Sequence, residues 1–280
     1  MTRLWEQEVI AGLRDSVPRD DVMRRLLTGF DWEACSRVDE GRGAVLVLKR
    51  DADARPITRV EAAAAPPNDD VLRSLLEWGV ALSRAAGAPI AQVWRPVGTA
   101  GWLRELGLEP VRPWWRMDRS LETPLPPVQP VDGYRLLDPA GVPAGAWADA
   151  YNHSFADHWR HSPRAPEQLG MSERPDLSLM AADAEGRPAA ITLCEIETLR
   201  ADARPQPVGL VASVGTLPAH RRRGLARWLV AESLTRLKAG GAATASLYVD
   251  GRNEHRAAEL YSNLGFVVTF DTTVWEATFP

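Results

Sequence analysis

The sequence predicts an α/β (α+β) fold made of two tandem copies of one unit, each a mixed, mostly antiparallel sheet flanked by helices. Three observations predict it. Apolar runs of strand length alternate with amphipathic runs of helical length. A proline-rich stretch at residues 122–130 divides the 280 residues near the middle. A helix–glycine–strand pattern in the first half recurs in the second half.

Two pairs of segments carry the repeat. Residues 84–94 align with residues 238–248, each as a helix end followed by a strand. Residues 102–108 align with residues 260–266, each as a helix, a glycine stop and a strand. Such units occur in any α/β protein, but here both their order and their spacing match. We therefore expect a first domain over residues 1–121, a linker over 122–130 and a second domain over 131–280.

The second half is expected to contain its elements in a fixed order. Gly265 is the expected C-cap of the last helix, and a first-half strand over residues 111–121 is expected to match the closing hairpin. The expected elements are a strand at 134–137, helical segments at 143–155 and 165–169, strands at 177–184, 188–197 and 208–216, a helix at 225–237, a strand at 243–249, a helix at 254–264, and two hairpin strands at 266–270 and 273–279.

An arginine-rich loop between a strand and a helix carries the clearest signal of function. Residues Arg221-Arg222-Arg223-Gly224 lie between the apolar run 208–214 and the amphipathic run 225–237. Gly224 lacks a Cβ, so a ligand can approach the backbone closely there. The free amides and the dipole at a helix start favour an anion. The loop predicts a phosphate or pyrophosphate site, with a plain helix cap as the alternative.

The spacing Arg221-x-x-Gly224-x-Ala226 resembles the acyl-CoA pyrophosphate loop of the GNAT superfamily of N-acyltransferases. A Walker loop does not fit because no Gly-Lys-Ser/Thr follows, and the dinucleotide fingerprint needs three spaced glycines. Downstream, the segment from Asn253 to Phe266 resembles the "N…A…LYxxLGF" segment of the same superfamily. The resemblance is specific over residues 208–270.

The resemblance implies transfer of an acyl group from acetyl-CoA, or from another acyl-CoA, to the primary amine of a small molecule. The amine would attack directly in a ternary complex that holds both reactants together. Tyr261 would protonate the leaving thiolate, since a phenol with a pKa of about 10 can supply a proton; packing under the sheet is its alternative role. The residues expected to bind acyl-CoA are Val214, Gly215, Thr216, Arg221, Arg222, Arg223, Gly224, Leu225, Ala226 and Asn253.

The general base is where this sequence departs from many GNAT relatives, which often carry a Glu on the strand before the loop. Residues 209–214 contain no carboxylate. The candidates are Glu195 and Glu197 on the neighbouring strand, and Asp157 and His158 after the first helix of the second half. An unperturbed histidine has a suitable pKa of about 6.5. A solvated surface position explains each of them equally well, and a water chain or an already neutral amine are further alternatives.

The first copy is expected to have lost the cofactor loop. Its Asn68-Asp69-Asp70 stands where Arg222-Arg223-Gly224 stands in the second copy. Two carboxylates cap a helix well and repel a pyrophosphate. Leu103 stands where Tyr261 stands, so the phenol is absent. The first half is therefore expected to shape the cleft of the second.

Composition limits the remaining possibilities. A formal net charge of -4 gives no reason to expect a nucleic acid or an anionic membrane as partner. The two cysteines, Cys35 and Cys194, are expected to be free buried thiols, and no metal site is expected. No signal peptide or long apolar run is seen, which predicts a cytoplasmic protein, monomer or homodimer. Trp159, Trp228 and Trp275 are expected to line the cleft or to fill the core.

Three functions stay open at this level. The first is a tandem GNAT acetyltransferase with one active copy, a layout that resembles the mycothiol synthase group, although the missing strand Glu argues against transferring that group's substrate. The second is a non-catalytic acyl-CoA sensor or scaffold. The third is an acetyltransferase for protein amines.

Overall fold

The computed structural model describes the chain except residues 28–30, 40, 53–54, 66–67, 99–100, 170–173 and 205. The α-helices of the described chain are α1 Thr2–Ile10, α2 Asp20–Leu26, α3 Trp32–Cys35, α4 Asp69–Ala85, α5 Ala144–Phe155, α6 Leu225–Ala239 and α7 Ala257–Asn263. The strands are β1 Ser16–Val17, β2 Ser36–Asp39, β3 Gly43–Ala52, β4 Arg55–Ala64, β5 Ile90–Pro96, β6 Glu109–Ser120, β7 Arg135–Leu136, β8 Leu179–Ala182, β9 Pro188–Glu197, β10 Ala201–Asp202, β11 Val208–Thr216, β12 Thr244–Asp250 and β13 Val267–Thr278.

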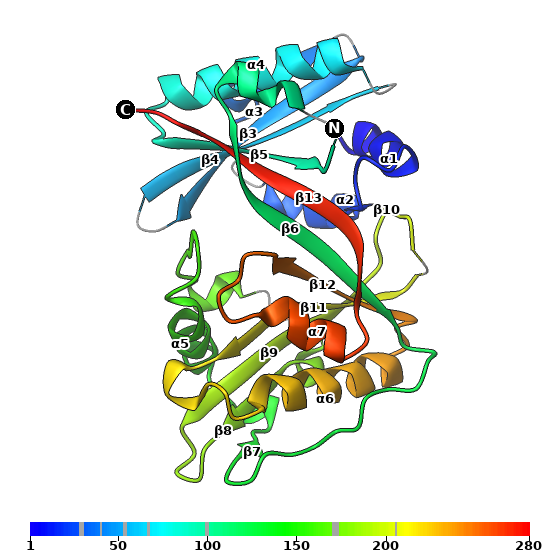
Figure 1. Cartoon of the computed structure of the whole chain (residues 1–280), viewed down its shortest axis with the longest axis vertical. Coiled ribbons are helices and arrows are strands. Elements are labelled where there is room, and N and C mark those ends of the chain that lie inside the picture. Colours follow the sequence, from blue (N-terminus) through cyan, green and yellow to red (C-terminus); the bar gives the residue numbers. More distant parts are fainter. Residues whose placement is uncertain are drawn as a thin grey trace.

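One mixed sheet runs through the whole described chain. Its eleven strands lie in the order β2-β3-β4-β5-β13-β6-β12-β11-β9-β8-β7, and β1 pairs with β10 in a separate ribbon. Most neighbours are antiparallel, whereas β4–β5 and β11–β12 are parallel. Figure 1 shows β6 and β13 crossing diagonally between the two halves, with the C-terminus beside α4 of the first half.

The two halves exchange their last strands. β6 of the first half lies between β12 and β13, and β13 of the second half lies between β5 and β6. Each half therefore completes the sheet of the other. The division at residues 122–130 stays a prediction, because the sheet itself does not stop there.

The expected hairpin at residues 266–270 and 273–279 is wrong. β13 is one strand, and the polar residues Asp271 and Thr272 pair with Trp115 and Trp114 of β6 instead of forming a turn. Two register shifts along the β6–β13 ladder, at Val268/Phe270 and at Val274/Trp275, absorb the local irregularity. Polar residues fit this strand because one of its faces borders a cavity.

The tandem repeat is confirmed at the level of single hydrogen bonds. Gly107 and Gly265 both have positive φ, +75° and +88°. The Leu108 amide donates to the Leu103 carbonyl at 3.2 Å, and the Phe266 amide donates to the Tyr261 carbonyl at 3.0 Å. The matching glycine stops end both short helices with the same geometry.

Each face of the sheet carries its own helices, because side chains alternate along a strand. In the first half, Val45 and Val60 pack against α4, whereas Leu46 and Ala63 pack against Trp5 of α1. In the second half, α6 and α7 share one apolar cluster and α5 packs with β8 and β9 in another. The face that carries α1 and α5 also carries the main cavity.

Several smaller expectations need correction. Residues 166–168 form only a single 3-10 turn rather than part of an α-helix. The helix expected from residue 254 begins at Ala257, because Asn253 first caps a turn: its side-chain oxygen accepts from the His255 amide at 2.8 Å. The prediction for the cysteines is confirmed in that both are free; Cys194 is buried and Cys35 is half-buried.

Candidate active site

Two parallel strands separate in the middle of the second half and open a slot. The β11–β12 pairing ends at Leu210 and Ser246, although β11 continues to Thr216 and β12 to Asp250. A β-bulge between Val211 and Ser213 bends β11 at the point of separation. Over the described residues 213–216, the edge of β11 that faces β12 has no strand partner. Its peptide groups can pair with an extended ligand.

The arginine-rich loop leads from this slot into α6. Arg222 and Gly224 adopt positive φ, +63° and +87°, so the chain turns sharply before the helix begins at Leu225. No side chain caps α6. The amides of its first turn therefore stay available to an anion, as the sequence predicts. Arg222 and Arg223 are exposed beside them.

Arg221 links its own loop to the end of β11 and to the end of α5 with the residues that follow it. Its guanidinium makes two hydrogen bonds to the Asp157 carboxylate, at 2.6 and 3.0 Å, and donates to the carbonyls of Thr216 and Ser154. Hydrogen bonds from Arg221 hold the pKa of Asp157 well below its usual range. Asp157 is therefore a carboxylate engaged in holding the loop, which argues against its use as a base.

Tyr261 and Asn253 lie on the other side of the slot. Both line the cavity. Tyr261 belongs to α7, is buried, and packs its ring 6.1 Å from that of Phe266. Burial raises the pKa of the Tyr261 phenol well above its ordinary value, so the hydroxyl keeps its proton at neutral pH.

The other three candidates for the general base, His158, Glu195 and Glu197, occupy different places. His158 lines the cavity, and burial lowers the pKa of its imidazole, which keeps the ring neutral at physiological pH. Glu195 and Glu197 lie on β9, and neither is among the described residues that line the cavity. The structure places His158 among the residues that line the cavity, and it does not place the two glutamates there.

A large cavity joins the slot to the first half of the chain. Its volume is about 1170 Å³. The floor includes Trp114 of β6, Phe270 of β13 and Tyr248 of β12, which come from the exchanged strands and their neighbour. The first half also contributes Arg14, Asp15, Arg59, Glu61, Gln92, Trp94 and Arg95. Sequence reasoning missed all seven, although Arg59 and Glu61 stand two residues apart, as do Gln92 and Trp94, a spacing that places each pair on one face of a strand.

The first half lacks an open anion site at the matching place. β4 and β5 also separate after three residue pairs, ending at Arg59 and Gln92. The Asn68 side chain, however, accepts from the amides of Asp70 and Val71 at 3.1 Å and caps α4. The first-turn amides are therefore uncapped in α6, whereas in α4 the Asn68 side chain already accepts hydrogen bonds from them.

The tryptophans divide between cavity and core. Trp159 lines the cavity. Trp228 and Trp275 are buried in apolar clusters, so their alternative role as core residues is the one observed. In the described part of the chain, no group of three or more His, Cys, Asp or Glu side chains suits a metal ion, and no helix is long and apolar enough to cross a membrane.

The sequence profile of the acetyltransferase (GNAT) family matches residues 144–266. A mycothiol acetyltransferase of Catenulispora acidiphila is 30% identical over 257 residues, covering 86% of this chain and 74% of that protein. The chain belongs to the GNAT acetyltransferase family. The matched range includes the loop before α6 and both strands of the β11–β12 opening.

Other GNAT proteins agree in sequence and in fold. A mycothiol acetyltransferase of Nocardia farcinica is 35% identical over 208 residues, covering 67% of this chain and 65% of that protein. The chain thus spans a little less than two thirds of that relative. A GCN5-related N-acetyltransferase of Sphaerobacter thermophilus has the same fold, with a TM-score of 0.77 at 22% identity, covering 99% of this chain and 91% of that one. A tandem GNAT protein from the clavulanic acid biosynthesis pathway has a TM-score of 0.70 at 16% identity, covering 100% and 94%.

Proposed function

We propose that this chain is an acetyl-CoA-dependent N-acetyltransferase that acylates the primary amine of a small molecule by direct attack in a ternary complex. One observation carries the proposal: the unpaired edge of β11 leads straight into the uncapped start of α6. The edge suits an amide-bearing arm and the helix start suits a pyrophosphate. Acyl-CoA is a ligand that has both, in that order.

The residues of the slot would then have distinct tasks. The amides of residues 222–226 bind the pyrophosphate, and Asn253 contacts the pantetheine arm or shapes the loop beside it. The peptide groups of Val214, Gly215 and Thr216 pair with the arm and polarise the thioester carbonyl. Acetyl-CoA supplies the activated acyl group when bound.

Transfer forms a carbon–nitrogen bond and breaks the carbon–sulfur bond. Tyr261 donates its phenolic proton to the departing sulfur, because burial keeps that proton in place until a thiolate is present. The nitrogen loses a second proton as the amide forms, and this proton restores the phenol. The ammonium proton of the acceptor leaves before attack. His158 is the candidate to accept it, since its ring is neutral and lines the cavity.

Calorimetric titration with acetyl-CoA tests the cofactor site. We expect one site per chain, because Asn68 caps the matching helix of the first half. Two sites would show that the first copy is intact, and no binding would overturn the proposal. Release of free CoA on adding a panel of small amines then separates an enzyme from an acyl-CoA sensor. Turnover only with peptide lysines would favour a protein acceptor.

A further inference from the structure

Ion pairs crowd the first-half end of the cavity. We call them the cationic cluster: Arg14, Arg59, Arg95 and Arg160 with Glu8, Glu61 and Glu276. Four guanidiniums face three carboxylates, so the cluster carries one excess positive charge. Burial alone would raise the pKa of Glu61, but Arg59 and Arg14 outweigh burial and lower it, so this carboxylate is ionised and fully used.

Arg95 is a buried member of the cluster that has an unused donor. Its side chain is only 6% exposed, and its Nη1 donates a hydrogen bond to Glu8 at 3.0 Å. The Arg95 Nε and the Trp94 Nε1 have no hydrogen-bond partner among the described residues, and both residues line the cavity. Both oxygens of Glu8 are already engaged, by Arg95 and by Arg14. A buried cation with unused donors favours a further anion.

The other two carboxylates of the cationic cluster, Glu61 and Glu276, are paired with arginines other than Arg95. Glu61 contacts Arg14 and Arg59, one through each oxygen. Glu276 accepts from Gln92 at 2.8 Å and from Arg160 at 3.2 and 2.9 Å. Each of the three carboxylates is thus already paired with at least one arginine.

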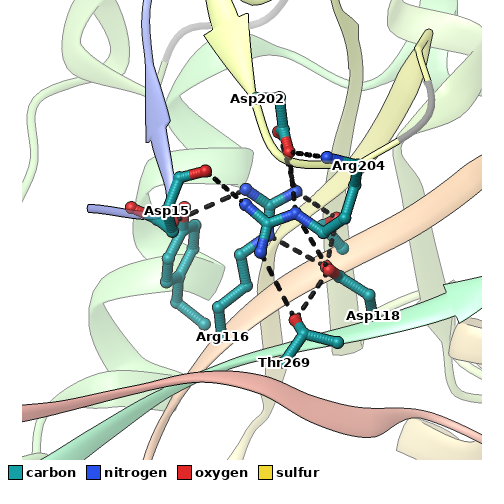
Figure 2. Close-up of polar contacts among 8 residues, drawn as sticks. Asp15, Arg116, Asp118, Asp202, Arg204 and Thr269 are labelled. Atoms are coloured by element: carbon teal, nitrogen blue, oxygen red, sulfur yellow. Dashed lines mark hydrogen bonds and ion pairs between the residues drawn. The ribbon is translucent and has the colours of Figure 1, made fainter. Parts of the chain in front are cut away.

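A second group of ion pairs at the cavity has the opposite excess charge. Figure 2 shows the acidic cluster, which consists of Asp15, Asp118 and Asp202 around Arg116 and Arg204. Three carboxylates face two guanidiniums, which leaves one excess negative charge. The cluster meets the cavity through Asp15 and Arg116, and Asp15 accepts a hydrogen bond from Tyr248 of β12.

Glu197, a neighbouring carboxyl group, is affected by the negative charge of the acidic cluster. Burial, together with the charges of Glu195, Asp202 and Asp15, raises the pKa of Glu197 to about 7 against the opposing effect of Arg116. Tyr248, which donates to Asp15, lies on β12, and Arg95 lies on β5. Strands β6 and β13 separate β12 from β5, so Tyr248 and Arg95 are three strand spacings apart, roughly 15 Å.

We propose that this polarity selects the acceptor: an elongated primary amine with a carboxylate at its far end, the amine toward Asp15 and Tyr248 and the carboxylate against Arg95 and Trp94. The inference rests on the proposed function and names its substrate class. A carboxylate fits better than a phosphate monoester, since one negative charge balances the cationic cluster and two exceed it. The spacing favours an ω-amino acid over an α-amino acid.

Matched acceptors test the proposal on the unmodified protein. ω-Amino acids of four to eight carbons are compared with their carboxamides in a CoA-release assay. We expect kcat/KM at least about 10-fold higher for the carboxylates, since a charge-assisted hydrogen bond is typically worth that much or more. Equal or faster turnover of the carboxamides would overturn the inference and leave the acetyltransferase intact. Absence of acetyl-CoA binding would instead overturn the proposed function.

A variant pair locates the preference. Arg95→Gln should remove the carboxylate preference, measured as the ratio of kcat/KM for each amino acid to kcat/KM for its carboxamide. Arg73 lies on α4 and forms an exposed ion pair with Glu105. Arg73→Gln breaks this pair and should leave the carboxylate preference unchanged. If Arg95→Gln does not fold, inhibition of the unmodified protein decides: hexanoate should compete with the acceptor at least about 10-fold better than hexanamide. Equal inhibition would contradict the proposal.

Discussion

Ser154 lies directly against the backbone of Gly215. A Cβ added to Gly215 would stand 2.7 Å from the Ser154 Cβ, 3.0 Å from its Oγ and 3.1 Å from the Phe155 ring. The end of α5 is therefore pressed onto β11 at the point where the thioester is expected. Glycine is needed here for close approach rather than for an unusual φ.

Gly215→Ala should push α5 away from β11. We expect kcat/KM for acetyl-CoA to fall at least about 10-fold, together with a loss of about 1–3 kcal/mol in the free energy of unfolding from overpacking. Steady-state kinetics and urea unfolding measure the two effects. Adding Ser154→Gly removes the closest contact, so the double variant should recover part of the activity; further loss would show that Ser154 itself is required.

Gly224→Val should abolish acetyl-CoA binding. Gly224 has a φ of +87°, which a β-branched residue adopts only with strain of about 1–2 kcal/mol, and the new side chain would cover the amides at the start of α6. Gly87→Val is the matched control, since Gly87 has a φ of +73° and open space around it in the first copy. Calorimetry should show lost affinity only for Gly224→Val. Equal losses would remove the pyrophosphate-loop assignment.

Tyr261→Phe should lower kcat about 100-fold and leave the acetyl-CoA Kd unchanged, because a positioned general acid typically contributes that much. Burial raises the pKa of this phenol, so the hydroxyl stays protonated and its loss should not be masked at any ordinary assay pH. Kinetics give kcat and calorimetry gives Kd. Full activity in the variant would leave Tyr261 as a packing residue against Phe266.

The sequence predicts the local parts of this molecule well. Gly107, Gly224 and Gly265 are needed where the backbone turns, and each is recognisable because its neighbours alternate in a strand or helix pattern. The strand Pro188–Glu197 and the start of α6 at Leu225 match the expected bounds. Such features depend on residues close in the chain.

Pairing between distant strands is not predictable in the same way. β6 pairs with β12 through contacts such as Leu247 with Met117, which lie far apart in the chain, and both copies offer strands of similar pattern. Nothing local distinguishes a strand that stays in its own half from one that crosses over. The cavity floor depends on that crossing, so Trp114 and Arg95 could not be placed in the site beforehand.

Glu197→Gln should stabilise the protein at alkaline pH. Burial and Glu195 raise the pKa of the folded-state carboxyl to about 7, whereas the unfolded value is about 4.3. The folded state binds the proton more tightly, so Glu197 costs stability as the pH rises from 4.3 through 7, and the cost is complete above that range. Urea unfolding should therefore find Glu197→Gln more stable by up to about 3 kcal/mol at pH 8 and equal to the unmodified protein below pH 4.

The exposed Glu254→Gln is the control for this measurement and should show no such difference at either pH. Because Glu197 is not among the described residues lining the cavity, Glu197→Gln should also keep its kcat near that of the unmodified protein. A variant that is less stable at pH 8 would mean that the attraction of Arg116 outweighs burial and the neighbouring carboxylates. A stabilised variant without activity would instead restore Glu197 as the general base, acting through water.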